Sequence, residues 1–294
     1  MQTIRVTAAA LNQTPLDWSG NCDRIRRAIA GARESCVSIL CLPELCLTGY
    51  GCEDAFLSAG LRSRAIDMLE ELLPETKGML VTFGLPLLYQ NALYHTVALA
   101  GDGKLLGVVA KRYLAGDGIH YEPRWFKPWP AGLQKSIHLG GREVPLGDLD
   151  FDVDGVRIGF EICEDAWVAQ RPGAAAALRG ADIILNPSAS HFAFGKCDVR
   201  ERFVLEGSRA YNVSYVYSNL VGNESGRAIY DGEMLIASAG HLLKRGPRFS
   251  FRDIMLTTAD IDLDHTRTSQ VRTHSYQPQM DEDLPDPVRA SFPW

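Results

Sequence analysis

Short apolar runs, each of strand length and each ended by a turn residue or a charged residue, recur along the chain. These runs predict strands over residues 3–10, 37–42, 79–84, 156–163, 181–185, 213–218, 234–238 and 254–261. Two further runs, 93–99 and 105–110, flank Gly101-Asp102-Gly103, which predicts a β-hairpin. Because helical patterns separate some of the runs, the chain favours an α/β fold in which helices cover the sheets.

Helices are predicted over 22–34, 174–179 and 199–211. Gly180 follows the second of these, as glycine commonly does where a helix ends. From His265 onward the composition changes, and residues 281–287 are acidic and rich in proline, which is typical of linkers. We therefore predict one domain over 1–264 and a C-terminal arm or linker over 265–294.

The composition is that of an ordinary globular protein, with 46% hydrophobic and 22% charged residues among 294. A formal net charge of −6 without a basic stripe argues against a nucleic-acid partner. No apolar run approaches the ~18 residues of a membrane span, and the N-terminus lacks the pattern of a signal peptide. The seven scattered cysteines form no C-x-x-C pair and match no zinc spacing, so we expect a reducing cytoplasm.

Three reactive side chains follow apolar runs at the points where the strands are expected to end. Glu44 comes after residues 39–43, Lys111 after 106–110 and Cys163 after 158–162. Strand ends of one layer can meet at one pocket. A thiol attacks as its thiolate, a carboxylate can take up the proton, and an ammonium can stabilise an oxyanion. Taken singly, each residue is more often structural, since a buried cysteine is usually a small core residue.

The chain resembles the nitrilase (carbon–nitrogen hydrolase) superfamily in Leu42-Pro43-Glu44, in Lys111 and in Glu161-Ile162-Cys163-Glu164-Asp165. Longer patches resemble the glutaminase domain of glutamine-dependent NAD synthetases, namely residues 43–54, 124–129, 163–167, 186–192, 218–220 and 230–232. The resemblance covers roughly residues 3 to 262. It implies a nitrilase-like α-β-β-α sandwich in a single domain.

The resemblance also assigns catalytic roles. Cys163 would attack the side-chain amide carbon of glutamine, and Glu44 would serve as general base and then as general acid for ammonia. Lys111 and the backbone N–H of Glu164 would hold the oxyanion, while Glu122 would orient Lys111 and the attacking water. The function implied is hydrolysis through a cysteine thioester, and we expect neither a metal nor another cofactor.

Recognition of glutamine requires opposite charges at a fixed separation, for its α-ammonium and its α-carboxylate. By resemblance, Glu164 and Ser190 would lie on the ammonium side and Lys196 on the carboxylate side. For Lys196, an exposed loop lysine is an equal alternative.

Aromatic residues would line the same pocket. Tyr50 lies where the family places an aromatic side chain. The family often has Tyr-Arg-Glu where this chain has His120-Tyr121-Glu122, so either Tyr121 or His120 would line the pocket. For His120 the simpler reading is a loop residue rather than a proton shuttle.

The synthetase domain of these enzymes carries a Ser-Gly-Gly-x-Asp-Ser phosphate loop, and this sequence contains neither that segment nor another phosphate-binding motif. We therefore expect the ammonia to be used by an ATP-dependent NAD synthetase-type domain or subunit. Two alternatives remain open. One is a free-standing hydrolase of another small amide or ureido compound, and the other is a catalytically quiet regulatory subunit. The resemblance further implies a homo-oligomer, at least a dimer.

Overall fold

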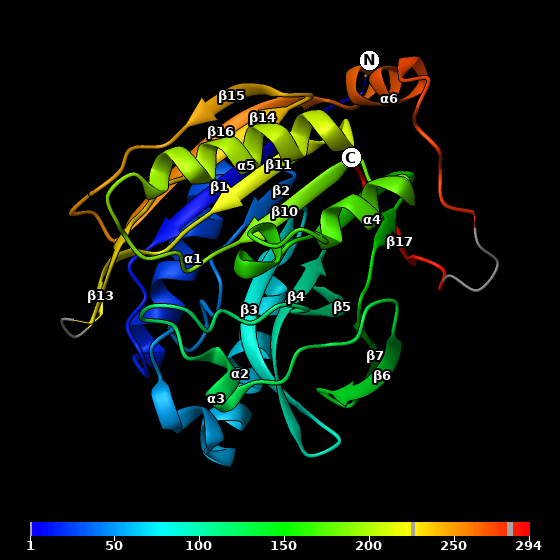
Figure 1. Cartoon of the computed structure of the whole chain (residues 1–294). Coiled ribbons are helices and arrows are strands. Elements are labelled where there is room, and N and C mark those ends of the chain that lie inside the picture. The colour runs from blue at the N-terminus through cyan, green and yellow to red at the C-terminus, as the bar shows by residue number, and fades with distance from the viewer. Residues whose placement is uncertain (1, 225–226, 281–284) are drawn as a thin grey trace.

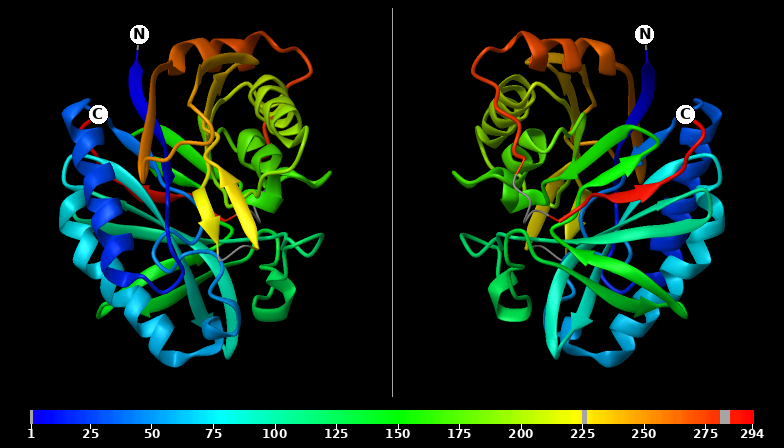
Figure 2. Two further views of the ribbon diagram at one scale, coloured as in Figure 1. Left: turned by 90° about the vertical axis from the view of Figure 1, so that its left-hand side faces the viewer. Right: turned by 90° about the vertical axis from the view of Figure 1, so that its right-hand side faces the viewer.

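Two β-sheets lie face to face in the middle of the molecule, with helices along both outer sides (Figure 1, Figure 2). The computed structural model describes residues 2–224, 227–280 and 285–294. Each sheet is mixed, and each has three neighbouring parallel strands, β1–β2–β3 in one sheet and β9–β10–β11 in the other.

The first sheet has eight strands in the described part of the chain. In hydrogen-bonding order they are β16 (Ile254–Asp262), β1 (Thr3–Leu11), β2 (Ile39–Cys41), β3 (Leu80–Tyr89), β4 (Ala92–Gly101), β5 (Lys104–Ala110), β7 (Arg142–Gly147) and β6 (Gln134–Leu139). β2 and β3 run parallel, and β4 pairs antiparallel with both β3 and β5. β5 therefore runs in the direction of β2, and both strands end at the same edge of the sheet.

The second sheet is built from the C-terminal half of the chain. In order, its described strands are β15 (His241–Arg245), β14 (Leu235–Ser238), β11 (Ser214–Ser218), β10 (Ile183–Pro187), β9 (Val156–Phe160), β8 (Phe151–Val153) and β17 (Val288–Ala290). β9, β10 and β11 run parallel. A separate ribbon consists of β12 (Val221–Glu224) and β13 (Ala228–Asp231).

Buried apolar side chains form three layers, and these layers fix the positions of the helices. α1 (Trp18–Glu34) and α2 (Ala59–Leu72) cover the first sheet, and α4 (Pro172–Leu178) and α5 (Lys196–Tyr211) cover the second (Figure 2). Along β1 the side chains alternate: Ala8 and Ala10 face the second sheet, whereas Ala9 and Leu11 face the helices. The α-β-β-α sandwich expected from the sequence is confirmed.

Shorter helical segments connect these elements. They are η1 (Glu53–Leu57), η2 (Leu73–Thr76), α3 (Glu122–Trp125) and η3 (Cys163–Ala166), and α6 (Leu263–Arg272) follows β16. Within the residues that the structure describes, every helix is too short or too polar to cross a membrane.

Most predicted elements are present with shifted bounds, and the hairpin around residues 101–103 is confirmed by β4 and β5. The predicted strand 156–163 is too long. β9 ends at Phe160, and Cys163 begins η3 with a left-handed backbone, φ +47°. The sequence did not predict three helices, α2, α3 and α6, or seven strands, β6, β7, β8, β12, β13, β15 and β17.

The chain beyond residue 264 has more structure than its composition suggested. α6 spans residues 263–272, so the expected boundary at 264 falls inside a helix. β17 pairs in parallel with β8, and Phe292 is buried, which joins the end of the chain to the second sheet. The acidic residues 281–284 lie outside the described part. The division into a domain and an arm stays a prediction.

Gly84 on β3 lies against the loop that follows β2. A Cβ atom at this position would lie 2.2 Å from the backbone nitrogen of Leu45 and 3.0 Å from the carbonyl carbon of Glu44. Gly84→Ala should therefore lower the free energy of unfolding by about 1–3 kcal/mol, measured by urea denaturation. The matched control is Gly60→Ala in α2, where the Cβ meets only Ser58 Oγ at 3.6 Å. Equal stability of the two variants would contradict the close approach.

Candidate active site

A buried cluster of one ammonium and two carboxylates lies at the edge where β2 and β5 end. Lys111 Nζ is 2.5 Å from Glu44 Oε1 and 2.8 Å from Glu122 Oε1. All three side chains are buried. The structure thus brings together three of the four residues expected to be catalytic.

Each member of the cluster is held by the backbone as well. Lys111 directly follows β5, Glu44 lies in the loop after β2, and Glu122 begins α3. The N–H of Ala189 donates to Glu44 Oε2 at 2.8 Å, and the N–H of Ala115 donates to Glu122 Oε2 at 3.0 Å. Because Ala189 follows β10, both sheets contribute to the position of Glu44.

Cys163, the fourth expected residue, is buried and hydrogen-bonds with the Glu44 side chain. Its left-handed backbone is a conformation that residues other than glycine seldom adopt. The turn is fixed by Asp165, whose carboxylate accepts from the N–H groups of Ile162 at 2.9 Å and Tyr113 at 2.8 Å. The thiol and the carboxylate are therefore a nucleophile and a base within reach of each other.

Burial and the neighbouring charges decide the protonation states at rest. Burial raises the pKa of the Cys163 thiol, and the Glu44 carboxylate raises it further, so the thiol is neutral. Burial also raises the pKa of Glu44, to about 7, although Lys111 opposes this shift. Burial works to lower the pKa of Lys111, but Glu122 and Glu44 hold it well above its usual value. Lys111 thus remains an ammonium ion.

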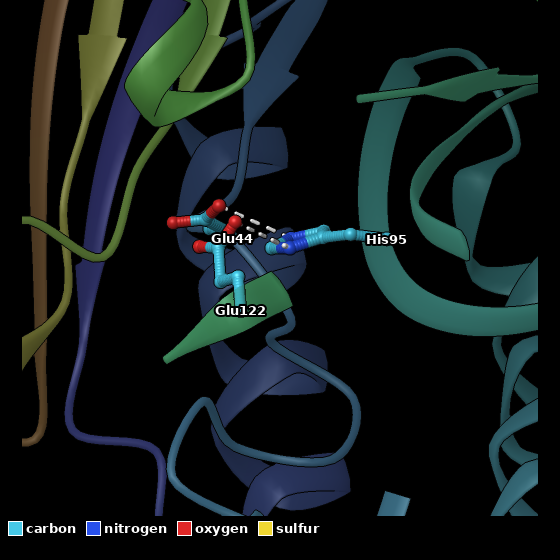
Figure 3. Close-up of side chains that lie close together, drawn as sticks. All are labelled: Glu44, His95 and Glu122. Atoms are coloured by element: carbon cyan, nitrogen blue, oxygen red, sulfur yellow. Dashed lines mark ion pairs between the residues drawn. The ribbon is translucent and has the colours of Figure 1, made fainter. Parts of the chain in front are cut away.

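His95 is a member of this site that the sequence analysis missed. It lies on β4, is fully buried, and points toward both carboxylates (Figure 3). Its Nε2 is 3.1 Å from Glu44 Oε1, without the alignment of a hydrogen bond, and its Nδ1 is 3.8 Å from Glu122 Oε2. Burial and Lys111 hold its pKa well below the usual value, so the ring is neutral. The one signal in the sequence was a histidine inside an apolar strand.

Glu44, His95 and Glu122 each present a ligand atom, and such a group could in principle hold a metal ion. Here the Lys111 ammonium contacts both carboxylates and supplies the positive charge that a cation would bring. The residues therefore form an ammonium-centred cluster, and the expectation of a metal-free site stays a prediction.

A pocket of about 270 Å³ opens in front of Cys163. Its lining consists of Ala115, Asp117, Gly118, His120, Cys163, Glu164, Trp167, Ser190, His191 and Lys196. Three of the expected substrate contacts, Glu164, Ser190 and Lys196, are among them. Lys196 is not an exposed loop lysine, because it begins α5, lies 5.3 Å from the centre of the Trp167 ring and bonds His191 Nδ1 at 3.1 Å.

The two tyrosines expected in the pocket have different positions. The hydroxyl of Tyr50 donates to Glu122 Oε1 at 2.7 Å, so Tyr50 supports the cluster and does not line the Cys163 pocket as expected. Tyr121 is half exposed and packs under the guanidinium of Arg227, 4.8 Å from its ring centre. It does not line the Cys163 pocket, so the expectation for Tyr121 is corrected: its neighbour His120 occupies that place.

The wall that carries Ser190 is fixed by a buried arginine that the sequence analysis did not single out. Arg200 on α5 donates to Ser190 Oγ at 3.2 Å and to the carbonyl oxygen of His191 at 2.9 Å. Its guanidinium also pairs with Asp231 at 2.7 Å and with Glu233 at 3.1 Å, and these side chains are buried. One buried cation on α5 thus ties the Ser190 side of the pocket to the end of β13 and to the segment before β14.

Residues 5–270 match the family of carbon–nitrogen hydrolases. The chain belongs to the carbon–nitrogen hydrolase family. This membership and the nitrilase-type fold confirm the resemblance read from the sequence, and they make the chain a hydrolase of carbon–nitrogen bonds.

Among curated relatives, the glutamine-dependent NAD(+) synthetase of Saccharomyces cerevisiae is 34% identical over 278 residues. The match covers 90% of this chain and 39% of that protein. The enzyme of the same name from Mus musculus is 29% identical, and the match covers 99% of this chain and 44% of that protein. The chain therefore spans less than half the length of these relatives.

Solved structures show the same relation. A glutamine-dependent NAD(+) synthetase from Cytophaga hutchinsonii superposes with a TM-score of 0.84 at 45% identity, over 88% of this chain and 43% of that one. An amidase of the nitrilase superfamily from Nesterenkonia superposes with a TM-score of 0.70 at 22% identity, over 92% of this chain and 95% of that one. The amidase shares the fold of this chain.

Removal of the Arg200 cation should destabilise the protein strongly. Arg200→Met would leave the buried Glu233 without its cation, and we expect the free energy of unfolding to fall by about 3–5 kcal/mol in urea titrations. Arg209→Met, on the same helix, removes an exposed pair with Glu206 and should change stability little. If the two variants unfold alike, the pocket wall does not depend on Arg200.

Proposed function

We propose that this chain hydrolyses the side-chain amide of glutamine and releases ammonia. One observation carries the proposal: the buried Glu44–Lys111–Cys163 cluster opens into a pocket that holds Glu164 and Lys196, which have opposite charges. The names of the relatives, glutamine-dependent NAD(+) synthetases, support glutamine as the amide.

The reaction begins from a neutral thiol. As Cys163 Sγ attacks the amide carbon, Glu44 takes the thiol proton, so no free thiolate forms beside the buried carboxylate. The negative charge that develops on the amide oxygen faces the Lys111 ammonium and the N–H of Glu164 in the first turn of η3. Glu44 then gives its proton to the departing nitrogen, and ammonia leaves a glutamyl thioester.

The second half of the reaction uses the same groups in reverse roles. Glu44, again a carboxylate, takes a proton from water as the water oxygen attacks the thioester carbon. The carbon–sulfur bond breaks, glutamate leaves, and the proton returns to Cys163. Glu122 and the N–H of Ala189 hold Lys111 and Glu44 in place throughout.

The charged groups of the pocket would orient glutamine by its α-carbon. Lys196 would bind the α-carboxylate, and Glu164 with Ser190 Oγ would bind the α-ammonium. The Lys196 ammonium also lies 5.3 Å from the centre of the Trp167 ring. A small amide without these two charges would lose both contacts, which favours glutamine over other amides.

The released ammonia would be consumed by an ATP-dependent NAD synthetase domain or subunit. Support comes from the relatives, in which the region similar to this chain makes up less than half of each protein. The homo-oligomer and the cytoplasmic location stay predictions.

Cys163→Ala should abolish the release of glutamate and ammonia from glutamine, lowering kcat by at least about 10⁴-fold, because no covalent intermediate can form. The control is Cys36→Ala, which removes an exposed thiol and should keep full activity. In acid-quenched wild-type protein, mass spectrometry should find a glutamyl adduct on the peptide that contains Cys163.

The outcomes separate this proposal from its rivals. Retained activity in Cys163→Ala would exclude the thioester route. Wild-type protein that ignores glutamine but hydrolyses another member of an amide panel would identify an amidase of different specificity. No turnover of any amide, with or without a synthetase domain, would support the regulatory subunit.

The pH dependence should report Glu44 and Lys196 separately. Burial raises the pKa of Glu44 to about 7, so the base is protonated at lower pH and kcat/KM should fall below that value. Burial lowers the pKa of Lys196 to about 8, so its charge is lost at higher pH and KM for glutamine should rise there. Steady-state assays between about pH 5 and 9.5 would measure both limbs.

Lys196→Arg is the matched control for the alkaline limb. Arginine keeps its charge over this range, so the rise in KM above pH 8 should shrink to the part caused by the ammonium of glutamine itself. The acid limb should be the same in both proteins. An unchanged alkaline limb in the variant would argue against Lys196 as the carboxylate contact.

A further inference from the structure

A continuous line of polar contacts runs around the pocket from the substrate side to the catalytic cluster. Lys196 Nζ lies 3.1 Å from His191 Nδ1, and His191 Nδ1 lies 2.9 Å from His120 Nε2. His120 Nδ1 is 2.9 Å from the Tyr50 hydroxyl, which donates to Glu122 Oε1 at 2.7 Å. We call these five residues the relay.

With Lys196 bound to His191, the relay has one hydrogen too few to form all of its hydrogen bonds. An ammonium can only donate, so His191 Nδ1 accepts, and the ring carries its proton on Nε2. For its own contact with this nitrogen, His120 donates from Nε2 and shares the single lone pair of His191 Nδ1 with Lys196, which leaves His120 Nδ1 bare. The bare nitrogen needs the single hydroxyl hydrogen of Tyr50, which is also the hydrogen directed at Glu122.

A second proton on His120 would resolve this conflict, but the surroundings oppose it. Burial, followed by His191 and Lys196, lowers the pKa of His120 to about 3. His120 is therefore neutral near pH 7, and one of its two contacts stays unsatisfied while Lys196 holds His191. A buried polar contact without its hydrogen is costly.

The other arrangement of the rings satisfies every contact. If Lys196 leaves His191, then Nδ1–H of His191 can donate to His120 Nε2. Nδ1–H of His120 can then donate to the Tyr50 oxygen, and the Tyr50 hydroxyl donates to Glu122. Each ring still carries one proton, on Nδ1 instead of Nε2, so the charge is unchanged. Both rings line the pocket, where they can exchange protons with water.

We propose that His120 and His191 are positioning residues that couple the occupation of Lys196 to the arrangement of Glu122. The inference rests on the proposed function, in which the α-carboxylate of the substrate binds Lys196. A bound carboxylate draws the ammonium away from His191, both rings change tautomer, and the Tyr50 hydroxyl is fixed on Glu122.

The consequence reaches the catalytic base. Glu122 Oε1 accepts from both Tyr50 and Lys111, and Lys111 in turn contacts Glu44. Fixing the Tyr50 hydroxyl on Glu122 therefore orders the groups that surround the thiol only when a substrate with a carboxylate is present. The relay would raise kcat for glutamine in addition to any gain in binding.

A pair of substrates tests this coupling. 4-Aminobutanamide has the amide and the ammonium of glutamine but no carboxylate. We expect the wild-type kcat for glutamine to exceed that for 4-aminobutanamide by about tenfold, the value of one hydrogen bond. His120→Phe keeps the ring volume but breaks the relay, so this kcat ratio should fall toward one. His138→Phe, at an exposed histidine on β6, should keep the wild-type ratio.

A purely structural role of His120 would affect both substrates alike and leave the ratio unchanged. Tyr50→Phe breaks the relay at its next contact and should lower the ratio in the same way. Because both changes interrupt one chain, the double variant should have the ratio of the single variants, without further loss.

The ring tautomers give a readout independent of turnover. In ¹⁵N-histidine-labelled Cys163→Ala protein, which binds but does not convert glutamine, long-range ¹H–¹⁵N spectra identify the protonated nitrogen of each ring. Glutamine should move the proton of His120 and His191 from Nε2 to Nδ1, whereas 4-aminobutanamide should not. His120→Phe and His191→Phe in the same background assign the signals.

The results distinguish the relay from the function on which it rests. Wild-type protein that does not hydrolyse glutamine would overturn both. Wild-type protein that hydrolyses glutamine, while His120→Phe keeps the kcat ratio or both rings keep their protons on Nε2, would overturn the relay alone.

Discussion

The contact between the Lys111 ammonium and the carboxylates of Glu44 and Glu122 is the interaction on which the rest of the site depends. An ammonium and two carboxyl groups removed from water are costly unless their polar atoms have partners. The partners come from distant parts of the chain: Ala115 for Glu122, Ala189 for Glu44, and Tyr50 for Glu122. The cluster is therefore stable only after both sheets have packed, which ties the chemistry to the complete fold.

Cys163 stands apart from this cluster in how it is held. It contributes strain instead of charge, since a cysteine with φ +47° occupies a region that costs about 1–3 kcal/mol. Asp165 holds the turn by accepting from the N–H of Ile162 within the turn and from that of Tyr113 beyond β5. The same turn contains Glu164, which lines the pocket, so in the proposed mechanism the turn that strains the nucleophile would also supply the oxyanion donor.

The sequence predicted the reactive residues better than the residues that surround them, and the reasons are physical. Glu44, Lys111 and Cys163 follow apolar runs, and strand ends are readable from one sequence. His95 was missed because a histidine within an apolar strand is indistinguishable in sequence from a core residue. Only the fold, through β2 and β4, places it beside Glu44. α2 was missed although Leu61, Ala65 and Met68 have helical spacing. Tyr121 lies in the loop before α3. In such a loop, a shift by one residue along the sequence decides which side chain faces the pocket and which faces solvent.

The groups proposed for catalysis and those proposed for recognition are built on different parts of the sandwich. The ammonium and its carboxylates belong to the buried edge of the first sheet, whereas Ser190, His191 and Lys196 lie after β10, and Arg200 fixes the first two of these. The two parts meet at Ala189, next to Ser190, because its N–H donates to Glu44. His120 contacts both parts, since it faces Tyr50 on one side and His191 on the other. A hydrolase that must act only on its own amide gains selectivity in kcat, as well as in binding, if that contact responds to the substrate.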